Sequence, residues 1–221
     1  MDGIHDLGGM HGFGPIPIKQ GEYVFKADWE RRSFALAQAL AGPTPFVADQ
    51  HRQEIERLDA IDYLSMDYFE KWAVATGELL KQAGLVSQEE LDTGEKKFDI
   101  DGAAHPPTSS AALVGGMKQG AQLAHPAGTE GVRFAPGQPV RVLSNCPTGH
   151  TRAPRYVRSR VGSVALVRGV FQFADAVAAG RGPAPEPCYT VAFAARALWG
   201  KDAESDDVIY CDLWESYLEP A

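Results

Sequence analysis

The sequence predicts an α+β protein in which a mainly helical N-terminal part is followed by a small C-terminal β-barrel. Two observations lead to this prediction: apolar residues recur with helical spacing up to Gly94, and β-branched residues recur with strand spacing after Gly131. The segment between them is rich in Gly, Ala, Pro, Ser and His. We therefore expect a helical domain at 1–94, a linker at 95–131 with one short helix, and a barrel domain at 132–221.

The first twenty residues combine five glycines and two prolines with scattered apolar side chains. This composition prevents a regular helix. Ile, Leu, Met and Phe are nevertheless too frequent for an inert tail. The stretch predicts an extended arm laid along another chain, and a disordered leader is the alternative.

Two helices are expected directly after the arm. The first covers 28–42, with Asp28 as its N-cap, and the second covers 44–58, with Thr44 as its cap. Arg52 lies beside the thin apolar stripe of the second helix. It can snorkel out of that face with its stem packed, or it can point into an interface and meet an anion there.

The strongest amphipathic pattern predicts a helix over 65–83 with Ser65 as its cap. Tyr68 and Trp72 are four residues apart and therefore neighbours on its surface. A Ser-x-x-Glu capping signature predicts a further short helix over 87–94.

The second half should contain five short strands separated by glycines and by a Pro-rich loop at 178–187. The strand segments are F-A-P-G-Q-P-V-R-V-L, V-G-S-V-A-L-V, V-F-Q-F, C-Y-T-V-A-F and V-I-Y-C-D-L-W. The piece A-R-A-L-W-G around Leu198 predicts one helical turn between strands. This number of short strands indicates a small, partly open barrel of the SH3-like type.

Arginines concentrate in one part of the barrel half. From Gly131 to Ala174 the chain has seven Arg and no Lys, Asp or Glu, although its formal net charge is -8. The use of Arg alone favours a site that needs planar, two-pronged donors for a carboxylate, a phosphate or an oxidised sulfur. A solvated surface strand whose acidic partners lie elsewhere is the alternative.

The totals argue against several classes of function. An acidic balance is unsuited to nonspecific nucleic-acid or membrane-surface binding, and no apolar run is long enough to span a membrane. Cys146, Cys188 and Cys211 are widely spaced, which suits reduced thiols in a cytoplasm and predicts no metal site in this chain. Hydrolase, P-loop and dinucleotide motifs are missing from the sequence, and His150 near Cys146 is a weak nucleophile–base pair.

Several longer motifs follow one another along the chain. They are M-D-G-I-H-D-L-G-G-x-H-G-F-G-P-I at the start, V-F-x-x-D-W-E from Val24, G-H-T-R-x-P-R-Y-V-R from Gly149, Y-T-V-x-F, L-W-G, and D-L-W-E-x-Y-L-E-P-A at the end. Together they closely resemble the β subunits of nitrile hydratases. The resemblance covers both ends and most of the barrel half, and it is weak between Lys96 and Gly131.

This resemblance implies a cytoplasmic enzyme that hydrates nitriles to amides. The chain would pair with an α subunit into an αβ unit, usually doubled into an α2β2 heterotetramer. The family's low-spin Co(III) or Fe(III) would lie in the α subunit on a Cys-rich loop, two of whose sulfurs are oxidised, so this chain would bind no cofactor. Neither a nucleic acid nor a membrane is expected as a partner.

The resemblance also suggests which residues carry the chemistry. Arg52 and Arg152 match family arginines that donate to the oxygens of the modified cysteines of the partner. Tyr68 matches a tyrosine near the metal. Tyr156 and Arg158 are expected to be structural and to set the shape of the loop.

Ala48, His51 and Trp72 fall where substrate-pocket residues of the family lie. The sequence departs from the family pattern at three positions. His51 is polar in an apolar pattern, Phe69 replaces a tyrosine, and Ser159 replaces a glycine. The first change bears on the size of nitrile that fits, and the last bears on the turn after the arginine loop.

Two other readings of the sequence stay open at this point. One is a subunit of thiocyanate hydrolase, a related enzyme whose segments are divided differently between chains. The other is a non-catalytic SH3-like module that binds nucleic acid or escorts the α chain, although an escort would be expected to lack the helical half.

Overall fold

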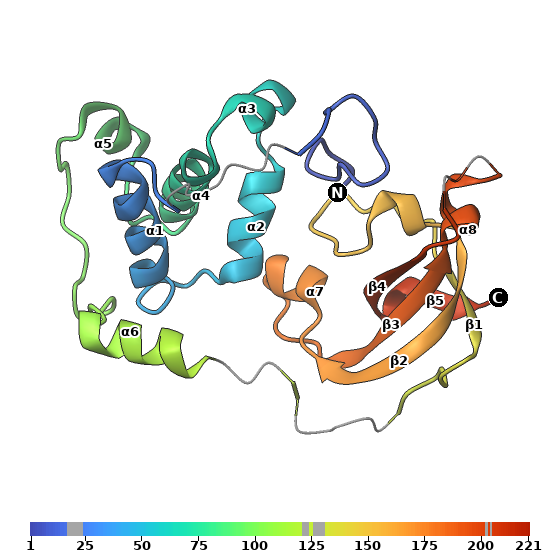
Figure 1. The fold of residues 1–221 in the computed structure, drawn as a ribbon. Helices are drawn as coiled ribbons and strands as arrows, with labels where there is room; N and C mark the ends of the chain where they lie inside the picture. Colours follow the sequence, from blue (N-terminus) through green and yellow to red (C-terminus); the bar gives the residue numbers. More distant parts are fainter. Residues whose placement is uncertain (17–23, 121–123, 126–130, 202, 204) are drawn as a thin grey trace. The chain divides into compact units, whose positions relative to one another are not determined.

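The protein forms two compact units in the computed structural model, which describes residues 1–16, 24–120, 124–125, 131–201, 203 and 205–221 (Figure 1). The helical unit consists of Gly3–His5 and Gly14–Ala121. The sheet unit consists of Met1–Asp2, Asp6–Phe13 and Gln122–Ala221. The end of the predicted arm at 17–20, and 121–123 and 126–130 of the predicted linker, lie outside the described residues.

The described part of the helical unit is built around one long helix, α4, which packs against both α1 and α2. Phe69, Ala75 and Leu79 of α4 are buried in this small core, because their spacing places them on one face of the helix. The helices are α1 (Asp28–Leu40), α2 (Ala48–Glu56), α3 (Ala60–Ser65), α4 (Tyr68–Gln82), α5 (Gln88–Thr93) and α6 (Ser110–Gln119).

Two predicted helix starts are wrong. The second helix begins at Ala48 instead of near Thr44, because the Val47 N–H is capped by the Gln50 side chain at 2.9 Å. Ser65 does not start the long helix. It ends α3, where its hydroxyl donates to the Ile61 carbonyl at 2.8 Å.

Three other local predictions are confirmed or nearly so. The first helix begins at Asp28, but its N-cap is Ala27. Ser87 caps α5, and Gly94 ends it with a left-handed φ of 71°. The weak apolar patch in the predicted linker forms α6.

The sheet unit contains one antiparallel sheet of five strands in the order β4-β3-β2-β1-β5. The strands are β1 (Pro139–Val142), β2 (Val161–Phe171), β3 (Glu186–Ala194), β4 (Val208–Trp214) and β5 (Leu218–Pro220). Within the described residues β4 and β5 form its two edges, so the sheet is not closed. The predicted number of strands is therefore right, whereas closure into an SH3-like barrel stays a prediction.

Two of the five predicted strands are one strand in the structure. The segments V-G-S-V-A-L-V and V-F-Q-F join into β2, which continues past Gly169 because that residue adopts a φ of 111° at a register shift. The fifth strand is instead β5, at the C-terminal end, which the sequence pattern did not indicate.

Alternating residues of the strands form the main core of the sheet unit. Val140, Val142, Val164, Val191 and Leu213 are fully or almost fully buried, together with Tyr189 and Phe193. Short helical segments connect the strands: η1 (Arg155–Val157), α7 (Ala174–Ala178), α8 (Ala195–Trp199) and η2 (Glu215–Tyr217). The helical turn predicted around Leu198 is thus confirmed as α8, and α7 was not predicted.

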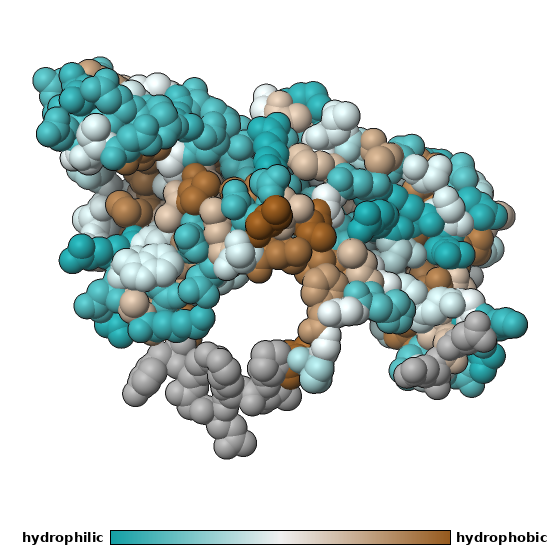
Figure 2. All heavy atoms as spheres, turned by 90° about the horizontal axis from the view of Figure 1, so that it is seen from above, coloured by the Kyte–Doolittle hydropathy of each residue, from teal (hydrophilic) through white to brown (hydrophobic). Residues whose placement is uncertain are grey.

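Several large apolar side chains stay at the surface. In the helical unit they include Val24, Ile61, Leu64 and Tyr68. Figure 2 shows apolar residues in brown among the hydrophilic ones on the face seen from above. Exposed apolar groups of this kind are typical of surfaces that bind another protein. Among the described residues, the helices are too short or too polar to cross a membrane.

Candidate functional site

A cavity of about 360 Å³ opens in the helical unit. Its wall is formed by residues of α1, α2 and α4 and of the segment before α2: Ala37, Gln38, Ala41, Phe46, Val47, Ala48, His51, Arg52, Ile55, Tyr68 and Trp72. Five of the six predicted site residues line it, namely Ala48, His51, Arg52, Tyr68 and Trp72. The sixth, Arg152, belongs to the sheet unit.

The helical repeat explains why these residues meet. Ala48, His51, Arg52 and Ile55 are spaced i, i+3, i+4 and i+7, so they share one face of α2. This face was expected to be the buried one. The structure instead buries Gln53 and Glu54 of α2, and turns the predicted stripe toward the cavity.

Trp72 is the centre of the aromatic wall of the cavity. Its ring centroid lies 5.7 Å from that of Tyr68, 5.2 Å from His51 and 5.9 Å from Phe34. Phe69, which departs from the family pattern, packs beside Trp72 at 5.9 Å and is buried. Edge-to-face and tilted contacts of this kind fix ring orientation, which gives the cavity a rigid apolar side.

His51 is half-buried and turned toward α4. Its Nε2 lies 3.2 Å from the Thr76 hydroxyl and 3.3 Å from the Trp72 carbonyl oxygen. Burial lowers the pKa of His51 below its usual value, and the Arg52 charge adds to this effect. The imidazole is therefore neutral near pH 7, so it serves as a polar but uncharged part of the cavity wall.

Arg52 lies at the rim of the cavity. Its Nη1 donates to Asp49 Oδ1 at 2.6 Å, and its side chain is 54% exposed. An exposed pair of this kind one helical turn apart contributes little to stability. Its guanidinium is therefore available to a stronger acceptor at little cost in the free energy of unfolding.

Arg152 lies in the loop between β1 and β2, the arginine-rich stretch of the sequence. Its side chain is exposed, whereas its backbone N–H donates to the Tyr217 hydroxyl at 3.0 Å. The Tyr217 hydroxyl in turn donates to Asp175 Oδ1. Burial raises the pKa of Tyr217 above its usual value, and the same cause raises that of Asp175. Sequence reasoning missed Tyr217 and Asp175, because no local pattern connects them to Arg152.

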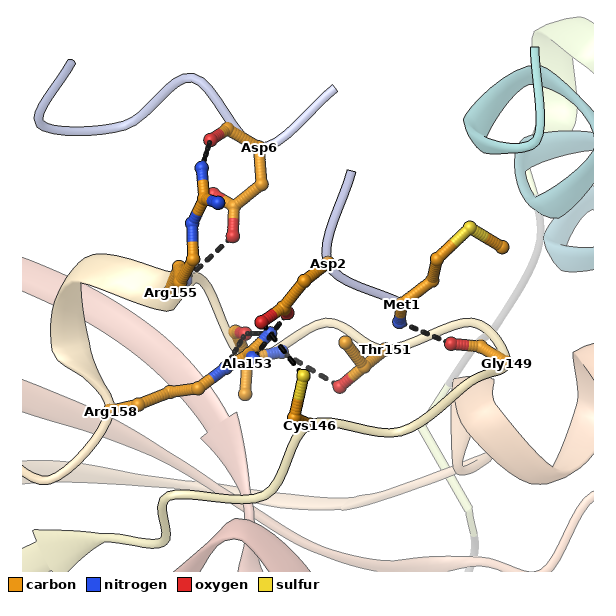
Figure 3. Close-up of polar contacts among 9 residues, drawn as sticks. All are labelled: Met1, Asp2, Asp6, Cys146, Gly149, Thr151, Ala153, Arg155 and Arg158. Atoms are coloured by element: carbon orange, nitrogen blue, oxygen red, sulfur yellow. Dashed lines mark hydrogen bonds and ion pairs between the residues drawn. The ribbon is translucent and has the colours of Figure 1, made fainter. Parts of the chain in front are cut away.

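Arg158 holds the same loop from inside. Its Nε and Nη2 donate to the Ala153 carbonyl oxygen at 3.1 and 3.0 Å, and its Nη1 pairs with Asp2 (Figure 3). The side chain is only 8% exposed. Tyr156 stacks on Trp199 with the ring centroids 5.4 Å apart. These contacts support the prediction that Tyr156 and Arg158 set the shape of the loop.

The first residues of the chain contact this loop. The Arg155 N–H donates to Asp6 Oδ2 at 2.7 Å, and the Cys146 thiol donates to Asp2 Oδ2 at 2.9 Å (Figure 3). The Cys146 hydrogen bond and the Arg158 guanidinium lower the pKa of Asp2. We predicted an arm along another chain, whereas residues 1–2 and 6–13 pack within the chain's own sheet unit.

Ser159 is one of two non-glycine residues with positive φ among the described residues, at 61°. Its N–H donates to the Val142 carbonyl oxygen at 2.8 Å, which fixes the turn into β2. A left-handed conformation strains a residue that has a Cβ. The glycine expected here would adopt it without strain, so the substitution lowers stability without releasing the turn.

The described residues offer no cluster of three His, Cys, Asp or Glu side chains that could hold a metal ion. Cys146, Cys188 and Cys211 are free thiols. Burial raises the pKa of Cys188 to about 12 and that of Cys211 to about 11, so neither is a thiolate at neutral pH.

Family models match nearly the whole chain. Residues 1–119 match the model described as "Nitrile hydratase beta subunit, N-terminal". Residues 124–220 match the model described as "Nitrile hydratase beta subunit, C-terminal".

Curated proteins of the same kind match over their full length. The nitrile hydratase subunit beta of Pseudomonas putida is 39% identical over 226 residues, covering 100% of both chains. The low-molecular weight cobalt-containing nitrile hydratase subunit beta of Rhodococcus rhodochrous is 40% identical over 227 residues, also covering 100% of both. The cobalt-containing nitrile hydratase subunit beta of Pseudonocardia thermophila is 31% identical, covering 99% of this chain and 96% of its own.

Among solved structures, a thiocyanate hydrolase from Thiobacillus thioparus, studied as recombinant apo-enzyme, matches 42% of this chain and 79% of its own. The two are 26% identical with a TM-score of 0.39, and we infer nothing from this match.

Proposed function

Because the chain belongs to the nitrile hydratase β-subunit family, we propose that it completes the active site of a nitrile hydratase together with an α subunit. Nitrile hydratase is a lyase that adds water to a nitrile and yields an amide, and it works as a complex of the two subunits. The observation that carries the proposal for this chain is the cavity of the helical unit, where five residues selected from the sequence meet.

The cavity has the properties that a small nitrile requires. Trp72 and Ala48 provide apolar contacts for the substrate's hydrocarbon part, and Tyr68 provides a hydroxyl at the rim. Tyr68 is exposed in the chain alone, as expected of a group that meets a partner. The neutral His51 adds polarity without charge. The residues therefore suit an uncharged ligand with one polar end.

Arg52 and Arg152 supply planar guanidinium groups for the oxidised cysteine sulfurs of the α subunit. Both are exposed in the chain alone, which supports a role toward a partner. Charge-assisted hydrogen bonds from guanidinium to an oxyanion are about twice as strong as neutral ones, and they orient both partners. Each arginine thus holds a sulfur oxygen in a fixed position next to the substrate.

The metal ion of the proposed enzyme belongs to the α subunit. When bound there, Co(III) or Fe(III) supplies Lewis-acid chemistry toward nitrile or water. The residues of this chain fit a role beside it, because guanidinium and phenol groups donate to oxyanions. Two relatives that match over the full length are cobalt-containing by name, which supports cobalt over iron.

The finer features of the assembly are proposed on the same ground. The exposed apolar side chains of the helical unit support burial against the α subunit. We infer an α2β2 heterotetramer in the cytoplasm, with the five-stranded sheet as an SH3-like domain.

The test is to co-express the chain with an α-type partner that carries a Cys-rich metal loop, and to measure amide formation from a small nitrile. We expect the complex to be active and each chain alone to be inactive. Amide formation by this chain alone, or an assembled and metal-loaded complex that leaves nitriles unchanged, would contradict the proposal.

A further inference from the structure

Two buried tyrosines of the sheet unit make the same pair of hydrogen bonds. The Tyr217 hydroxyl accepts the Arg152 N–H at 3.0 Å and donates to the Asp175 carboxylate. The Tyr189 hydroxyl accepts the Arg133 N–H at 3.0 Å and donates to Glu215 Oε2 at 2.5 Å. Each tyrosine therefore joins the backbone of an arginine to a carboxylate.

The two junctions differ in what surrounds the arginine. The residue after Arg152 is held as well, because its carbonyl oxygen, that of Ala153, accepts two hydrogen bonds from Arg158. The next residue, Pro154, has a fixed φ. The backbone on both sides of Arg152 is thus fixed by buried side chains, which we call the Arg152 clamp: Tyr217 and Arg158.

The clamp is buried while the residue it holds is exposed. Tyr217 is 7% exposed and Ala153 is also 7% exposed, and the Arg158 side chain is nearly as buried. Tyr217 is braced by Asp175 and Arg158 by Asp2. A long arginine side chain thus leaves a rigid base and reaches outward.

We propose that Tyr217 and Arg158 are positioning residues that act on catalysis through Arg152. The inference rests on the proposed function of Arg152 toward the oxidised cysteines of the α subunit. A fixed backbone restricts the positions that the guanidinium can reach, so less conformational freedom is lost when it engages its acceptor. Loosening the clamp lowers the fraction of complexes in which Arg152 is correctly placed.

The experiment compares Tyr217→Phe with Tyr189→Phe in the complete complex with the α subunit. Both variants lose one hydroxyl from a buried ring and leave one backbone N–H and one carboxylate without it. We expect Tyr217→Phe to lower kcat about tenfold with KM changed less than about twofold, which is the effect of one weakened hydrogen bond. We expect Tyr189→Phe to keep kcat within about twofold.

A double-mutant cycle distinguishes action through Arg152 from general damage. In an Arg152→Lys background, Tyr217→Phe should lower kcat by less than about twofold further, since the group that it positions has already been altered. Equal losses of kcat in the two tyrosine variants, or fully additive losses in the cycle, would overturn the inference.

Amide hydrogen exchange in the full-length chain provides a readout apart from activity. Tyr217→Phe and Arg158→Lys should speed exchange in the segment 150–155, and Tyr189→Phe should not. Unchanged exchange in both clamp variants would overturn the clamp while leaving the role of Arg152 intact. Faster exchange combined with normal turnover in Arg152→Lys would instead overturn the role of Arg152, and with it the effect of the clamp on catalysis.

Discussion

The two arginines proposed to meet the α subunit are held in different ways. Arg52 lies on a regular helix, one turn from the Asp49 carboxylate that it pairs with. Arg152 lies in an irregular loop whose backbone is fixed by side chains from distant parts of the sequence, with Tyr217 65 residues away. The first is placed by local structure and the second by the tertiary fold.

This difference shows what each region requires to present a guanidinium. A helix presents a side chain in a defined direction without further support, so the remaining residues around Arg52 can form a cavity. A loop lacks this regularity, and the sheet unit replaces it with buried hydrogen bonds. The loop is therefore the half whose function depends most on residues that never touch the substrate.

The largest effects are expected when either guanidinium is replaced. Arg52→Lys and Arg152→Lys in the αβ complex should each lower kcat on the order of 10²-fold, because an ammonium group does not reproduce the planar fork. The fold should persist, since both side chains are exposed. Circular dichroism and complex formation serve as controls, and near-normal turnover in either variant would refute the role assigned to that residue.

The next effect tests the aromatic wall of the helical half. Trp72→Ala should lower the free energy of unfolding by about 2 kcal/mol, less than for a fully buried tryptophan, and should enlarge the cavity. The enlarged cavity should shift preference toward bulkier nitriles, measured as a ratio of kcat/KM values. Trp29→Ala, an exposed tryptophan on α1, is the matched control. An unchanged preference would exclude Trp72 from the substrate pocket.

A smaller effect concerns the pH dependence of the same half. Burial lowers the pKa of His51, so the unfolded chain binds a proton there more readily than the folded one. The stability due to neutral His51 is therefore complete above the ordinary histidine pKa and falls as the pH decreases below it. His51→Gln should remove this part of the decrease in denaturant titrations, whereas the exposed His11→Gln should not. Identical pH profiles for His51→Gln and the unaltered chain would contradict the assignment.

The smallest effect concerns the loop half. Ser159→Gly should raise the free energy of unfolding by about 0.5–1 kcal/mol, because glycine adopts a φ of 61° without strain. Turnover should stay unchanged, since the N–H of residue 159 still bonds to Val142. Thermal unfolding measures the gain, with Ser163→Gly on β2 as a control that should lose stability. A loss of stability in Ser159→Gly would mean that the Ser159 side chain supports the turn.

Local chemistry in the sequence indicated much of the fold. The Ser87 capping signature and the alternation at Val140 and Val142 are short-range signals, and both elements form as predicted. The start of α2 was misplaced because Thr44 and Pro45 are good starting residues, whereas the actual cap uses the Gln50 side chain.

The site was predictable to a different extent in the two halves. Residues one turn apart on α2 and α4 could be grouped from their spacing and from family resemblance, and they line one cavity. The clamp could not be predicted, because Tyr217, Arg158 and Asp2 come together only through the sheet and the N-terminal residues. Spacing along the sequence carries no information about such contacts.

A solved structure of the αβ complex is the most direct test of the central claim that this chain presents two guanidinium groups to its partner. The account predicts that Arg52 and Arg152 each place a guanidinium nitrogen about 3 Å from oxygens on oxidised cysteines of the α subunit. A complex in which either side chain faces bulk water would contradict it.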